Sequence, residues 1–405
     1  MSTEGEGALF TAALGLQAPW RVASVRFDEE AKELHIYLDF ARGSVFACPG
    51  CGSWVKAYDT RERIWRHLNF FEHKCYLHAD FPRVECTDCG VHVVDAPWAR
   101  LGSGFTLLFE AYILKLCQSM PIRSVSRLVG EHDTRVWRCL MGYVERAREE
   151  VDMSDVTHLG VDETSWKAKY QYVTLFADLR QRRVLFVTEN KDANTVAEFQ
   201  MELFDHQGFA KQISTVCMDL SPAYKLGFSQ YFSQATQIFD RFHVMKLAND
   251  AVDQVRKQEA RTNQALKNTR FLWLSNPQNL TVKKQGQLAS MQTMNLATAK
   301  AYQMKLNLQE LWTLPDRETA QTHLEAWYTS VIHSKIGQPM KKLARTVKKN
   351  AHGILSFFPD RLTSGLMEGI NSLIQAAKAK ARGYTNLTYF KTVVYLIAGK
   401  LPLPT

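Results

Sequence analysis

Four cysteines in two Cys-x-x-Cys pairs form the clearest candidate metal site in this sequence. The pairs are Cys48–Cys51 and Cys86–Cys89, and a glycine follows the second cysteine of each, where a tight turn needs a permissive backbone. Two intervening residues let both thiolates of a pair reach one tetrahedral Zn²⁺, and four thiolates exclude water, as in a structural site. The spacing therefore predicts one structural Zn²⁺ held by Cys48, Cys51, Cys86 and Cys89.

Four unrelated buried cysteines, or a redox-active pair, are the other interpretations of this pattern, and the match between the two pairs argues against both. Cys75 and the histidines His67, His73 and His78 lie between the pairs and are interpreted as non-ligands. Eight cysteines in a chain whose first residues lack the basic segment of a secretory signal argue against a disulfide framework.

Three carboxylates far apart in the sequence form the candidate catalytic site. Asp162 lies in GVDETSW, Asp219 lies in CMDLSPAY, and Glu368 is the last acidic residue of the chain, in a stretch rich in Ala and Lys. Carboxylates brought together repel one another unless a cation is present, and hard oxygen ligands favour Mg²⁺ or Mn²⁺. Two such ions can activate a water or a 3′-hydroxyl and stabilise the leaving oxygen at a scissile phosphate. We therefore expect Asp162, Asp219 and Glu368 to bind two Mg²⁺ (or Mn²⁺) ions.

Each of these carboxylates also has a simpler explanation. A strand-end Asp162 is solvated in most proteins, Asp219 could cap the helix after it, and Glu368 could complement a helix dipole. The metal site is favoured because the predicted elements bring all three together.

Asp240-Arg-Phe-His243 is a further candidate, at the end of a predicted strand. His243 could hydrogen-bond the scissile phosphate and take up a charge near neutral pH, which would make it a fourth catalytic residue. The alternatives are that Asp240 caps a helix beside a packed His243, or that Asp240 is itself a metal ligand.

The hydrophobic pattern after residue 155 predicts the strands and helices that must position these residues. Three β-rich runs joined by tight turns precede alternating helices and strands, which is the ribonuclease H-like order. In that fold the first and fourth strands are adjacent, so Asp162 and Asp219 come within reach of one cation, and a later helix can bring Glu368. The expected strands are 156–166, 170–179, 182–189, 213–219 and 235–240, and the expected helices are 193–204, 222–232 and 243–261.

Two modules are expected before this core. Residues 22–27 and 34–40 predict a β-hairpin, and residues 63–80 predict extra strands between the cysteine pairs. Residues 105–150 have helical spacing with a break at Gly130, which predicts a helix-turn-helix or a plain helical hairpin. In the first case the second helix would enter a DNA major groove, with Arg135 and Arg138 as candidates for base or phosphate contact.

Residues 261–349 form a predicted helical insertion, because 148 residues separate Asp219 from Glu368. Trp273, Trp312 and Trp327 fall in it and are interpreted as buried anchors, with stacking on an unpaired or flipped base as the alternative.

Basic residues gather in two stretches that contain no acidic residue. For the first, residues 341–349, phosphate contact is favoured over a solvated face, since no Asp or Glu lies one helical turn away. The second, after Glu368, could hold the DNA backbone. The whole chain has 50 Lys and Arg against 41 Asp and Glu, which is a moderate indication of a polyanionic partner, and no apolar run is long enough for a membrane span. The candidate DNA-binding residues are Lys341, Lys342, Arg345, Lys348 and Lys349, followed by Lys378, Lys380 and Arg382.

Several stretches together resemble the ISL3 family of bacterial insertion-sequence transposases of the DDE class. They are CPGCG, FPRVECTDCG, GVDETSW, CMDLSPAY, IFDRFHVMK and LMEGINSLIQAAKAKARGY, and they span residues 48–384. The resemblance implies Asp162, Asp219 and Glu368 as the DDE triad, and a zinc-ribbon and helix-turn-helix head that binds terminal inverted repeats.

The expected fold is a multidomain α+β chain with a zinc-binding β module, a helix-turn-helix and a ribonuclease H-like α/β core. We expect DNA transposition by metal-dependent cleavage and strand transfer, with double-stranded DNA (terminal repeats and target) as partner. A homodimer or higher oligomer in the bacterial cytoplasm, with the nucleoid, is expected. The alternatives are a structure-selective nuclease without strand transfer and a non-catalytic DNA-binding factor. The expected boundaries are 1–98, 99–152, 153–260, 261–349 (the helical insertion) and 350–405.

Overall fold

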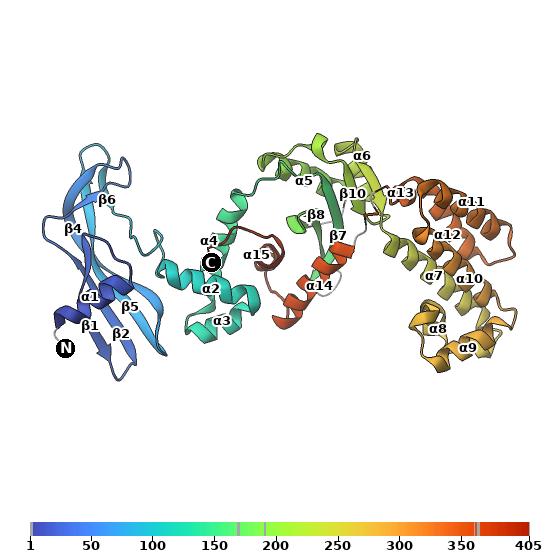
Figure 1. Ribbon diagram of the computed structural model, residues 1–405, viewed down its shortest axis with the longest axis horizontal. Helices are drawn as coiled ribbons and strands as arrows, with labels where there is room; N and C mark the ends of the chain where they lie inside the picture. Colours follow the sequence, from blue (N-terminus) through green and yellow to red (C-terminus); the bar gives the residue numbers. More distant parts are fainter. Residues whose placement is uncertain (1–2, 168–170, 190–191, 360, 363–364, 405) are drawn as a thin grey trace. The chain divides into compact units, whose positions relative to one another are not determined.

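The chain folds into two compact units, which Figure 1 shows in a computed structural model. The structure describes residues 3–167, 171–189, 192–359, 361–362 and 365–404. The first unit comprises Met1–Tyr143 with Pro402–Thr405, and the second comprises Val144–Leu401. Among the described helices, none combines the length and the apolar character that crossing a membrane requires.

A six-stranded sheet forms the first part of the N-terminal unit. The hairpin predicted from residues 22–27 and 34–40 is present as the antiparallel pair β1 and β2. The strand order is β1-β2-β5-β4-β3, with β6 paired to β5. The sheet elements and the helix that packs on β1 are α1 (Thr3–Ala13), β1 (Trp20–Asp28), β2 (Glu33–Phe40), β3 (Val45–Ala47), β4 (Trp54–Phe70), β5 (His73–Cys86) and β6 (Gly90–Val93).

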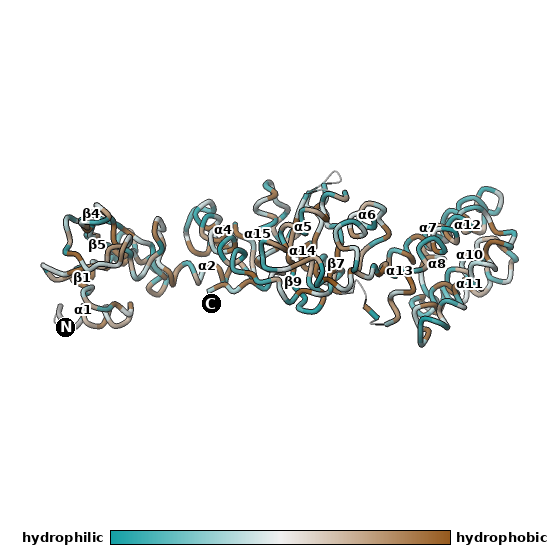
Figure 2. The backbone as a smooth tube through the Cα atoms, turned by 90° about the horizontal axis from the view of Figure 1, so that it is seen from above, coloured by the Kyte–Doolittle hydropathy of each residue, from teal (hydrophilic) through white to brown (hydrophobic). Residues whose placement is uncertain are grey.

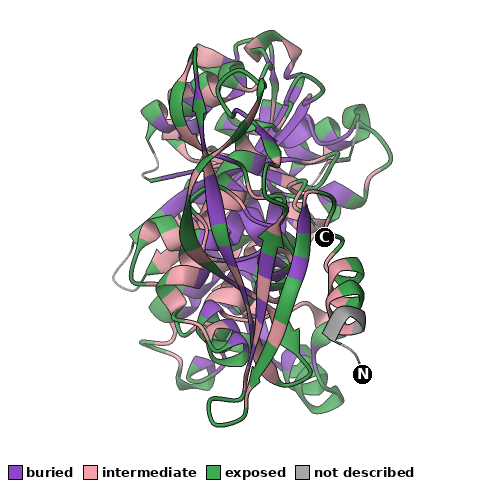
Figure 3. Cartoon of the chain, turned by 90° about the vertical axis from the view of Figure 1, so that its left-hand side faces the viewer, coloured by how far each residue is buried: buried purple, intermediate pink, exposed green. Residues whose placement is uncertain are grey.

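Alternation of buried and exposed residues positions this sheet on its core. Leu34, Ile36 and Leu38 of β2 are buried, and the residues between them are more exposed, as expected for a strand with one covered face (Figure 3). Trp20 of β1 stacks on Phe81 of β5 with ring centroids 5.4 Å apart. The extra strands predicted between the cysteine pairs are the long hairpin of β4 and β5.

A helix-turn-helix follows the sheet, as the sequence predicts. Its helices are α2 (Leu107–Ser119), α3 (Ile122–Val129) and α4 (Asp133–Glu149). The turn after α3 passes through Gly130 at φ +69°, a left-handed conformation that side chains disfavour. Arg66 of β4 joins sheet and helices, since its buried guanidinium pairs with Glu131 at 3.4 Å and lies 4.7 Å from the ring centroid of Phe109.

The second unit contains a five-stranded sheet in the order β11-β10-β7-β8-β9. β7, β8 and β9 are antiparallel neighbours, whereas β10 and β11 run parallel to β7. This is the predicted ribonuclease H-like arrangement, with the first and fourth strands of the core adjacent. Its elements are β7 (His158–Lys167), β8 (Gln171–Asp178), β9 (Arg183–Glu189), α5 (Ala193–Asp205), η1 (Ala210–Gln212), β10 (Thr215–Met218), α6 (Pro222–Tyr231) and β11 (Thr236–Phe239).

Helices cover both faces of this sheet. Phe176 of β8 stacks on Phe199 of α5 at 4.4 Å between ring centroids, which fixes α5 on one face. On the other face a Cβ at Gly160 of β7 would lie 2.7 Å from the sulfur of Met367, and at the sheet edge Val187 of β9 donates its backbone N–H to the hydroxyl of Tyr395 at 2.9 Å. The helices of that second face are α14 (Gly365–Lys380) and α15 (Leu387–Ala398).

The helical insertion predicted between Asp219 and Glu368 is built on α7, which starts at the edge of the sheet. Hydrophobic and hydrophilic residues alternate along its helices, as amphipathic packing requires (Figure 2). Trp273, Trp312 and Trp327 are all buried. The elements are α7 (Arg241–Glu259), η2 (Gln264–Leu266), α8 (Arg270–Leu274), η3 (Pro277–Asn279), α9 (Val282–Gln292), α10 (Ala297–Glu310), η4 (Leu311–Thr313), α11 (Arg317–His333), α12 (Gln338–Lys349) and α13 (Ala351–Leu355).

Candidate active site and nucleic-acid contacts

Three aspartates lie in a row across the parallel strands: Asp162 in the middle of β7, and Asp219 and Asp240 directly after the ends of β10 and β11. Cys217 of β10 pairs with Gly160 of β7, and continuing this register by two residues brings Asp219 opposite Asp162. Met218 pairs with Phe239 of β11, so the next residue, Asp240, lies opposite Asp219. The backbone N–H of Asp240 donates to the carbonyl of Met218 at 2.9 Å, which agrees with this register. Side chains at one level of neighbouring strands share a face of the sheet, so the three carboxylates face the same way.

The local backbone fixes the second and third of these carboxylates. Asp219 Oδ1 accepts a hydrogen bond from the N–H of Ser221 at 2.7 Å. Asp240 caps α7 by accepting from the N–H of Phe242 at 3.1 Å, and its other oxygen lies 2.9 Å from Nδ1 of His243. Asp240 therefore caps α7, and the same buried carboxylate also belongs to the row; the His243 side chain beside it is only partly buried.

Asp162 is more enclosed than Glu368, the predicted ligand on α14. The pKa of the Asp162 carboxyl is raised to about 6, first by burial and also by the charges of Asp219 and Asp240, whereas the hydrogen bond from Glu163 and the charge of His243 act in the opposite direction. The N–H of Glu163 donates to Oδ1 of Asp162 at 2.8 Å, and Nδ2 of Asn371 donates to Oδ2 at 2.6 Å. An elevated carboxyl pKa beside other carboxylates is the signature of a cluster that a cation would stabilise.

His243 supplies positive charge to this cluster. Its hydrogen bond with Asp240 raises the pKa of the imidazole despite burial, and the charges of Asp240, Asp219 and Asp162 act in the same direction. The side chain is 36% exposed, so the ring remains accessible to a substrate at the sheet edge.

Helix α14 brings Glu368 to the cluster by packing along β7. Gly160 leaves room for Met367, since a Cβ at Gly160 would lie 2.7 Å from the Met367 sulfur. One turn later Asn371 contacts Asp162, and the next turn places Nε2 of Gln375 2.8 Å from the Thr164 hydroxyl.

The surroundings of Glu368 show which end of the row it joins. Burial and then the charge of Asp240 raise the pKa of its carboxyl, whereas Arg241 and His243 lower it. Glu368 thus lies near Asp240 and His243, although its side chain is more exposed than that of Asp162.

The oxygen ligands of this cluster are of the type that a hard divalent cation binds. Carboxylate oxygens are the ligands that Mg²⁺ and Mn²⁺ prefer, and the buried Oδ1 of Asn371 beside them has no hydrogen-bond partner within the described ranges. In the described part of the chain, the carboxylates are spread more widely than the four cysteines, whose ligand atoms all lie within 4.8 Å of one another.

The cysteine cluster matches the predicted zinc site residue for residue: Cys48, Cys51, Cys86 and Cys89. The sulfurs of Cys51 and Cys86 are 3.5 Å apart, and hydrogen bonds from Ser53 lower the pKa of Cys51 to about 6, while the hydrogen bond with Cys51 raises the pKa of Cys89 to about 12. Thiols that share protons show such opposite shifts, and Zn²⁺ would deprotonate them all. The cluster therefore forms a structural zinc site. Cys75, His67, His73 and His78 lie outside it, as predicted.

The two candidate arginines of the helix-turn-helix have different surroundings. Arg135 pairs with Glu131 and lies 4.2 Å from the ring centroid of Phe105, so part of its charge is already engaged. Arg138, one turn further along α4, is exposed.

The basic stretch 341–349 lies on α12, where Lys342, Arg345, Lys348 and Lys349 are exposed and Lys341 is partly so. Lys348 does have an acidic partner, because Glu325 of the neighbouring helix α11 lies 3.5 Å away. This pair joins two helices, so the spacing of charges along one helix does not reveal it.

The end of α12 lies close to the carboxylate row. Burial, and after it the charge of Lys349, lower the pKa of Lys225, whereas the charge of Asp219 raises it. The Lys225 ammonium donates a hydrogen bond to Asn350 Oδ1 at 2.9 Å. Lys349 and Lys225 thus place positive charge on the Asp219 side of the cluster.

The three basic residues after Glu368 also differ from one another. Lys378 donates to the carbonyl of Ser165 at 2.6 Å, so it fastens α14 to β7. Lys380 and Arg382 are exposed, and Arg382 has a left-handed φ of +60° at the end of α14.

Sequence reasoning missed Asn371 and Gln375 as site residues. The signal that could have found them is spacing: with Met367 they recur every four residues on the α14 face that meets β7.

Comparisons with known proteins match three successive parts of the chain. A family model described as a transposase, the ISL3 DDE domain, matches residues 159–394. A helix-turn-helix domain of transposase family ISL3 matches residues 94–144, and the zinc-finger of transposases IS204/IS1001/IS1096/IS1165 matches residues 44–89.

Two relatives match nearly from end to end. The transposase for insertion sequence element IS1001 of Bordetella parapertussis is 27% identical over 396 residues, which cover 93% of this chain and 95% of that protein. The transposase for insertion sequence element IS1557 of Mycobacterium tuberculosis is 26% identical over 419 residues, with coverage of 93% and 92%.

Proposed function

This chain belongs to the ISL3 family of transposases, and from that premise we propose that it cuts DNA at the terminal inverted repeats of its insertion sequence and joins the 3′ ends to target DNA. The observation that carries the proposal is the row of Asp162, Asp219 and Asp240 on one sheet face, with Glu368 brought beside it by α14. A row of this kind has little use in a protein that only binds DNA.

Asp162, Asp219 and Glu368 would hold two Mg²⁺ or Mn²⁺ ions. Bound there, the ions supply activation of an oxygen nucleophile and stabilisation of the leaving oxygen. Asp240 is the fourth carboxylate of the site and keeps His243 in place through its Nδ1. Asn371 orients Asp162 by a direct hydrogen bond.

His243 would contact the DNA phosphate. With Nδ1 turned toward Asp240, Nε2 is the ring atom left to donate a proton to a phosphate oxygen. Its raised pKa keeps the imidazole protonated closer to neutral pH, which favours contact with an anion.

The N-terminal unit would select the DNA ends. A zinc ion held by Cys48, Cys51, Cys86 and Cys89 would fix the two cysteine turns, and Arg66 joins the sheet to the helix-turn-helix through Glu131. In α4, Arg138 and then Arg135 would reach base edges or phosphates of the major groove.

The basic residues of the second unit would hold the DNA backbone near the cut. They are Lys341, Lys342, Arg345, Lys348 and Lys349 of α12, with Lys380 and Arg382 after Glu368, whereas Lys378 would act by fixing α14. Because two ends must be brought together, a homodimer or higher oligomer would form on the DNA, with the nucleoid in the bacterial cytoplasm.

Strand transfer distinguishes this function from that of a nuclease on the same fold. The purified chain is given Mg²⁺, a labelled duplex of the gene's flanking terminal repeat with a pre-cut 3′-hydroxyl end, and a supercoiled plasmid. Label joined covalently to the plasmid is the expected product. Cutting of uncut ends without any joining would contradict strand transfer and leave a nuclease.

A further inference from the structure

The contact between strand β7 and helix α14 continues past the carboxylate row and ends in a pocket. Every second residue of the strand meets every fourth residue of the helix: Gly160 with Met367, Asp162 with Asn371, and Thr164 with Gln375. Two strand residues span about 6.6 Å and four helical residues about 6 Å, so the two elements stay in step. The next pair in this series, Trp166 and Ala379, lines a pocket of about 480 Å³, the β7–α14 pocket.

A β-bulge brings two consecutive side chains of β7 to this pocket. Ser165 pairs with Tyr172 of β8 and Lys167 pairs with Gln171, so Trp166 is the extra residue between the two pairs. In a regular strand neighbouring side chains point to opposite faces, whereas a bulge re-aims one of them. The bulge thus explains how Trp166 and Lys167 both line the β7–α14 pocket.

The turn at the end of α14 supplies further lining. Arg382 has φ +60° and Gly383 has φ +91°, so two successive residues adopt the left-handed conformation. Glycine or asparagine is usual at such a helix end, and an arginine there is disfavoured by its own side chain. The turn brings Arg382, Tyr384 and Thr385 to the pocket. An arginine kept in this conformation indicates that its guanidinium has a use.

Four side chains around the β7–α14 pocket carry hydrogen-bond donors that the fold leaves unused. Within the described ranges, no hydrogen-bond or ion-pair partner meets the side chains of Trp166, Lys167, Arg382 and Tyr384. The Lys167 ammonium instead lies 5.5 Å from the ring centroid of Trp166, and the Tyr384 ring meets Phe390 edge-on at 5.6 Å. Lysine and arginine only donate, and no carboxylate occurs among the described lining residues, so the matching ligand is an anion.

Lys378 lines the same pocket but is committed to the fold. Its ammonium donates to the carbonyl of Ser165 at 2.6 Å, to the Ser165 hydroxyl at 3.0 Å and to Oε1 of Gln375 at 3.3 Å. These three acceptors use all of its N–H groups. Lys378 therefore positions α14, and an anion is left to Lys167 and Arg382.

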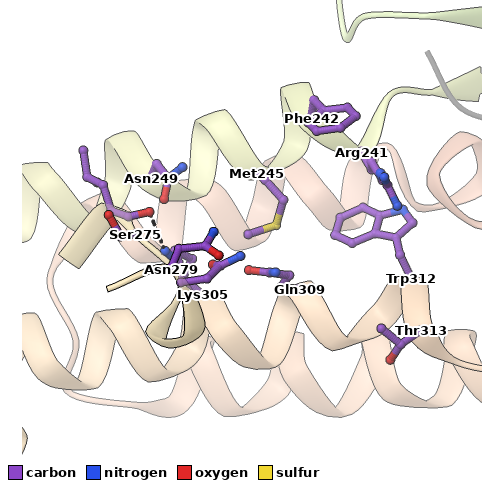
Figure 4. Close-up of a pocket in the computed structure, with 12 residues that line it drawn as sticks. Arg241, Phe242, Met245, Asn249, Ser275, Asn279, Lys305, Gln309, Trp312 and Thr313 are labelled. Carbon is purple, nitrogen blue, oxygen red and sulfur yellow. Dashed lines mark hydrogen bonds between the residues drawn. The ribbon is translucent and has the colours of Figure 1, made fainter. Parts of the chain in front are cut away.

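A pocket of about 440 Å³ along α7 differs from this one, because its cations are accounted for (Figure 4). The Lys305 ammonium donates to the carbonyls of Trp273 and Leu274 at 3.3 and 3.1 Å, which satisfies the end of α8. Arg241 stands beside the active site, where burial raises the pKa of Glu368 and the Arg241 charge lowers it. The free cations of the β7–α14 pocket have no such explanation among the described residues.

We propose that the β7–α14 pocket binds one backbone phosphate of the DNA at a fixed distance from the cut. Lys167 and Arg382 supply the positive charge, and Tyr384 and the indole N–H of Trp166 are further donors. Four strand residues separate Asp162 from Trp166, which is about 13 Å. Successive phosphates of one strand advance about 3.4 Å along the duplex axis, so the bound phosphate lies about four nucleotides from the scissile one.

This inference rests on the proposed DNA cleavage and deepens it. A phosphate held at the end of β7 and α14 gives the DNA a second fixed point on the two elements that carry Asp162 and Glu368. The distance between the two points then sets which phosphate the carboxylates reach.

The test pairs single changes in the protein with single changes in the DNA. Duplexes made from the gene's flanking terminal repeat carry one uncharged methylphosphonate at a time, at each phosphate around the cut on either strand. The rate of cleavage with Mg²⁺ is measured for the full-length wild type, Lys167→Met and Arg382→Met. Lys211→Met removes an exposed lysine of η1, outside the pocket, and serves as the control.

We expect one methylphosphonate, about four nucleotides from the cut, to slow the wild type and Lys211→Met at least about tenfold. Lys167→Met and Arg382→Met should cut the unmodified duplex more slowly and lose little more with that methylphosphonate, because the contact is already gone. An abasic nucleotide at the same position should leave the wild-type rate unchanged.

Equal sensitivity of the wild type and both pocket variants at every phosphate would overturn the phosphate site, while a normal cut of the unmodified duplex keeps the transposase. A rate lost to the abasic nucleotide and not to the methylphosphonate would show a base site instead. Inhibition by inorganic phosphate that Arg382→Met abolishes, with no sensitive position in the DNA, would show a site for a free anion instead. If the wild type leaves the unmodified duplex uncut, the proposed function fails and this inference fails with it.

Discussion

Asp162 shows how single residues of the site depend on contacts that the sequence does not display. Its carboxylate receives one hydrogen bond from its own strand, through the N–H of Glu163, and one from α14, through Asn371. The second contact joins residues 209 positions apart in the chain. Asp162 itself was predictable from its strand, whereas Asn371 was missed: its four-residue spacing from Met367 and Gln375 marks a face of the helix but does not show which strand that face meets.

Asn371→Leu should lower the rate of end cleavage by about 10- to 100-fold while leaving DNA binding unchanged. The physical reason is that Asp162 loses the donor that orients Oδ2, so it presents its oxygens to a cation less well. Ser372→Ala, an exposed neighbour on the same helix, serves as control and should cut at the wild-type rate. Cleavage by Asn371→Leu equal to that of Ser372→Ala would remove Asn371 from the site.

The buried Lys305 should make the stability of the fold depend on pH, independently of DNA cleavage. Burial lowers the pKa of its ammonium from 10.5 to about 8. Between about pH 8 and 10.5 the unfolded chain therefore holds a proton that the folded chain has released, so the free energy of unfolding rises with pH in this window. Lys305→Met lacks this contribution.

Denaturant unfolding at a series of pH values gives the free energy of unfolding of the wild type and of Lys305→Met. The contributions of the other titratable groups largely cancel in the difference between the two. The wild type should gain at most about 1.4 kcal/mol per pH unit relative to the variant above pH 8. If the difference in unfolding free energy between the two proteins stayed constant from pH 7 to 10.5, the Lys305 ammonium would be better solvated than its burial indicates.

At the scale of elements, the sequence predicts most of the second unit because its strands and helices have clear periods. The strand predicted at 213–219 is observed as β10, Thr215–Met218, and the long helix predicted at 243–261 is α7, Arg241–Glu259. What periodicity cannot provide is register. Only the pairing of β10 with β7 and β11 shows that Asp240 stands level with Asp162 and Asp219.

The zinc site belongs to this scale because it connects β-strand ends. Cys48→Ser should lose zinc and DNA-end binding, since three thiolates no longer close the site, while the second unit stays folded. Zinc content by atomic absorption and binding by gel shift are the measurements. Cys75→Ala removes a buried thiol outside the cluster and should keep its zinc. Full zinc content in Cys48→Ser would contradict the assignment.

Helix α12 gives a second prediction for an element. Changing Lys342, Arg345 and Lys349 to Gln should reduce the slope of log K against log salt by about 0.9 for each phosphate that these side chains no longer neutralise. Lys283→Gln with Lys284→Gln, on the exposed surface of α9, is the matched control and should leave the slope unchanged. Equal slopes for both variants would mean that α12 faces solvent in the complex.

At the scale of the whole molecule, one unit combines the zinc-held sheet with the helix-turn-helix, and the other combines the catalytic sheet with the helical insertion. The motifs predicted this order because each carries its own spacing signal along the chain. The pocket beside α7 was beyond prediction, since its walls come from three segments of the insertion. All three tryptophans of the insertion are buried, which is what their interpretation as anchors predicts.

The catalytic role of the carboxylate row is decided by cleavage of a duplex that spans the gene's flanking terminal repeat, with Mg²⁺. The wild type is compared with Asp162→Asn and with Glu163→Gln, which changes the neighbouring carboxylate on the opposite face of β7. We predict a defined cut at the repeat boundary for the wild type and Glu163→Gln, none for Asp162→Asn, and equal DNA binding by all three. A cut of normal rate by Asp162→Asn would contradict the assignment of the carboxylate row as the catalytic centre.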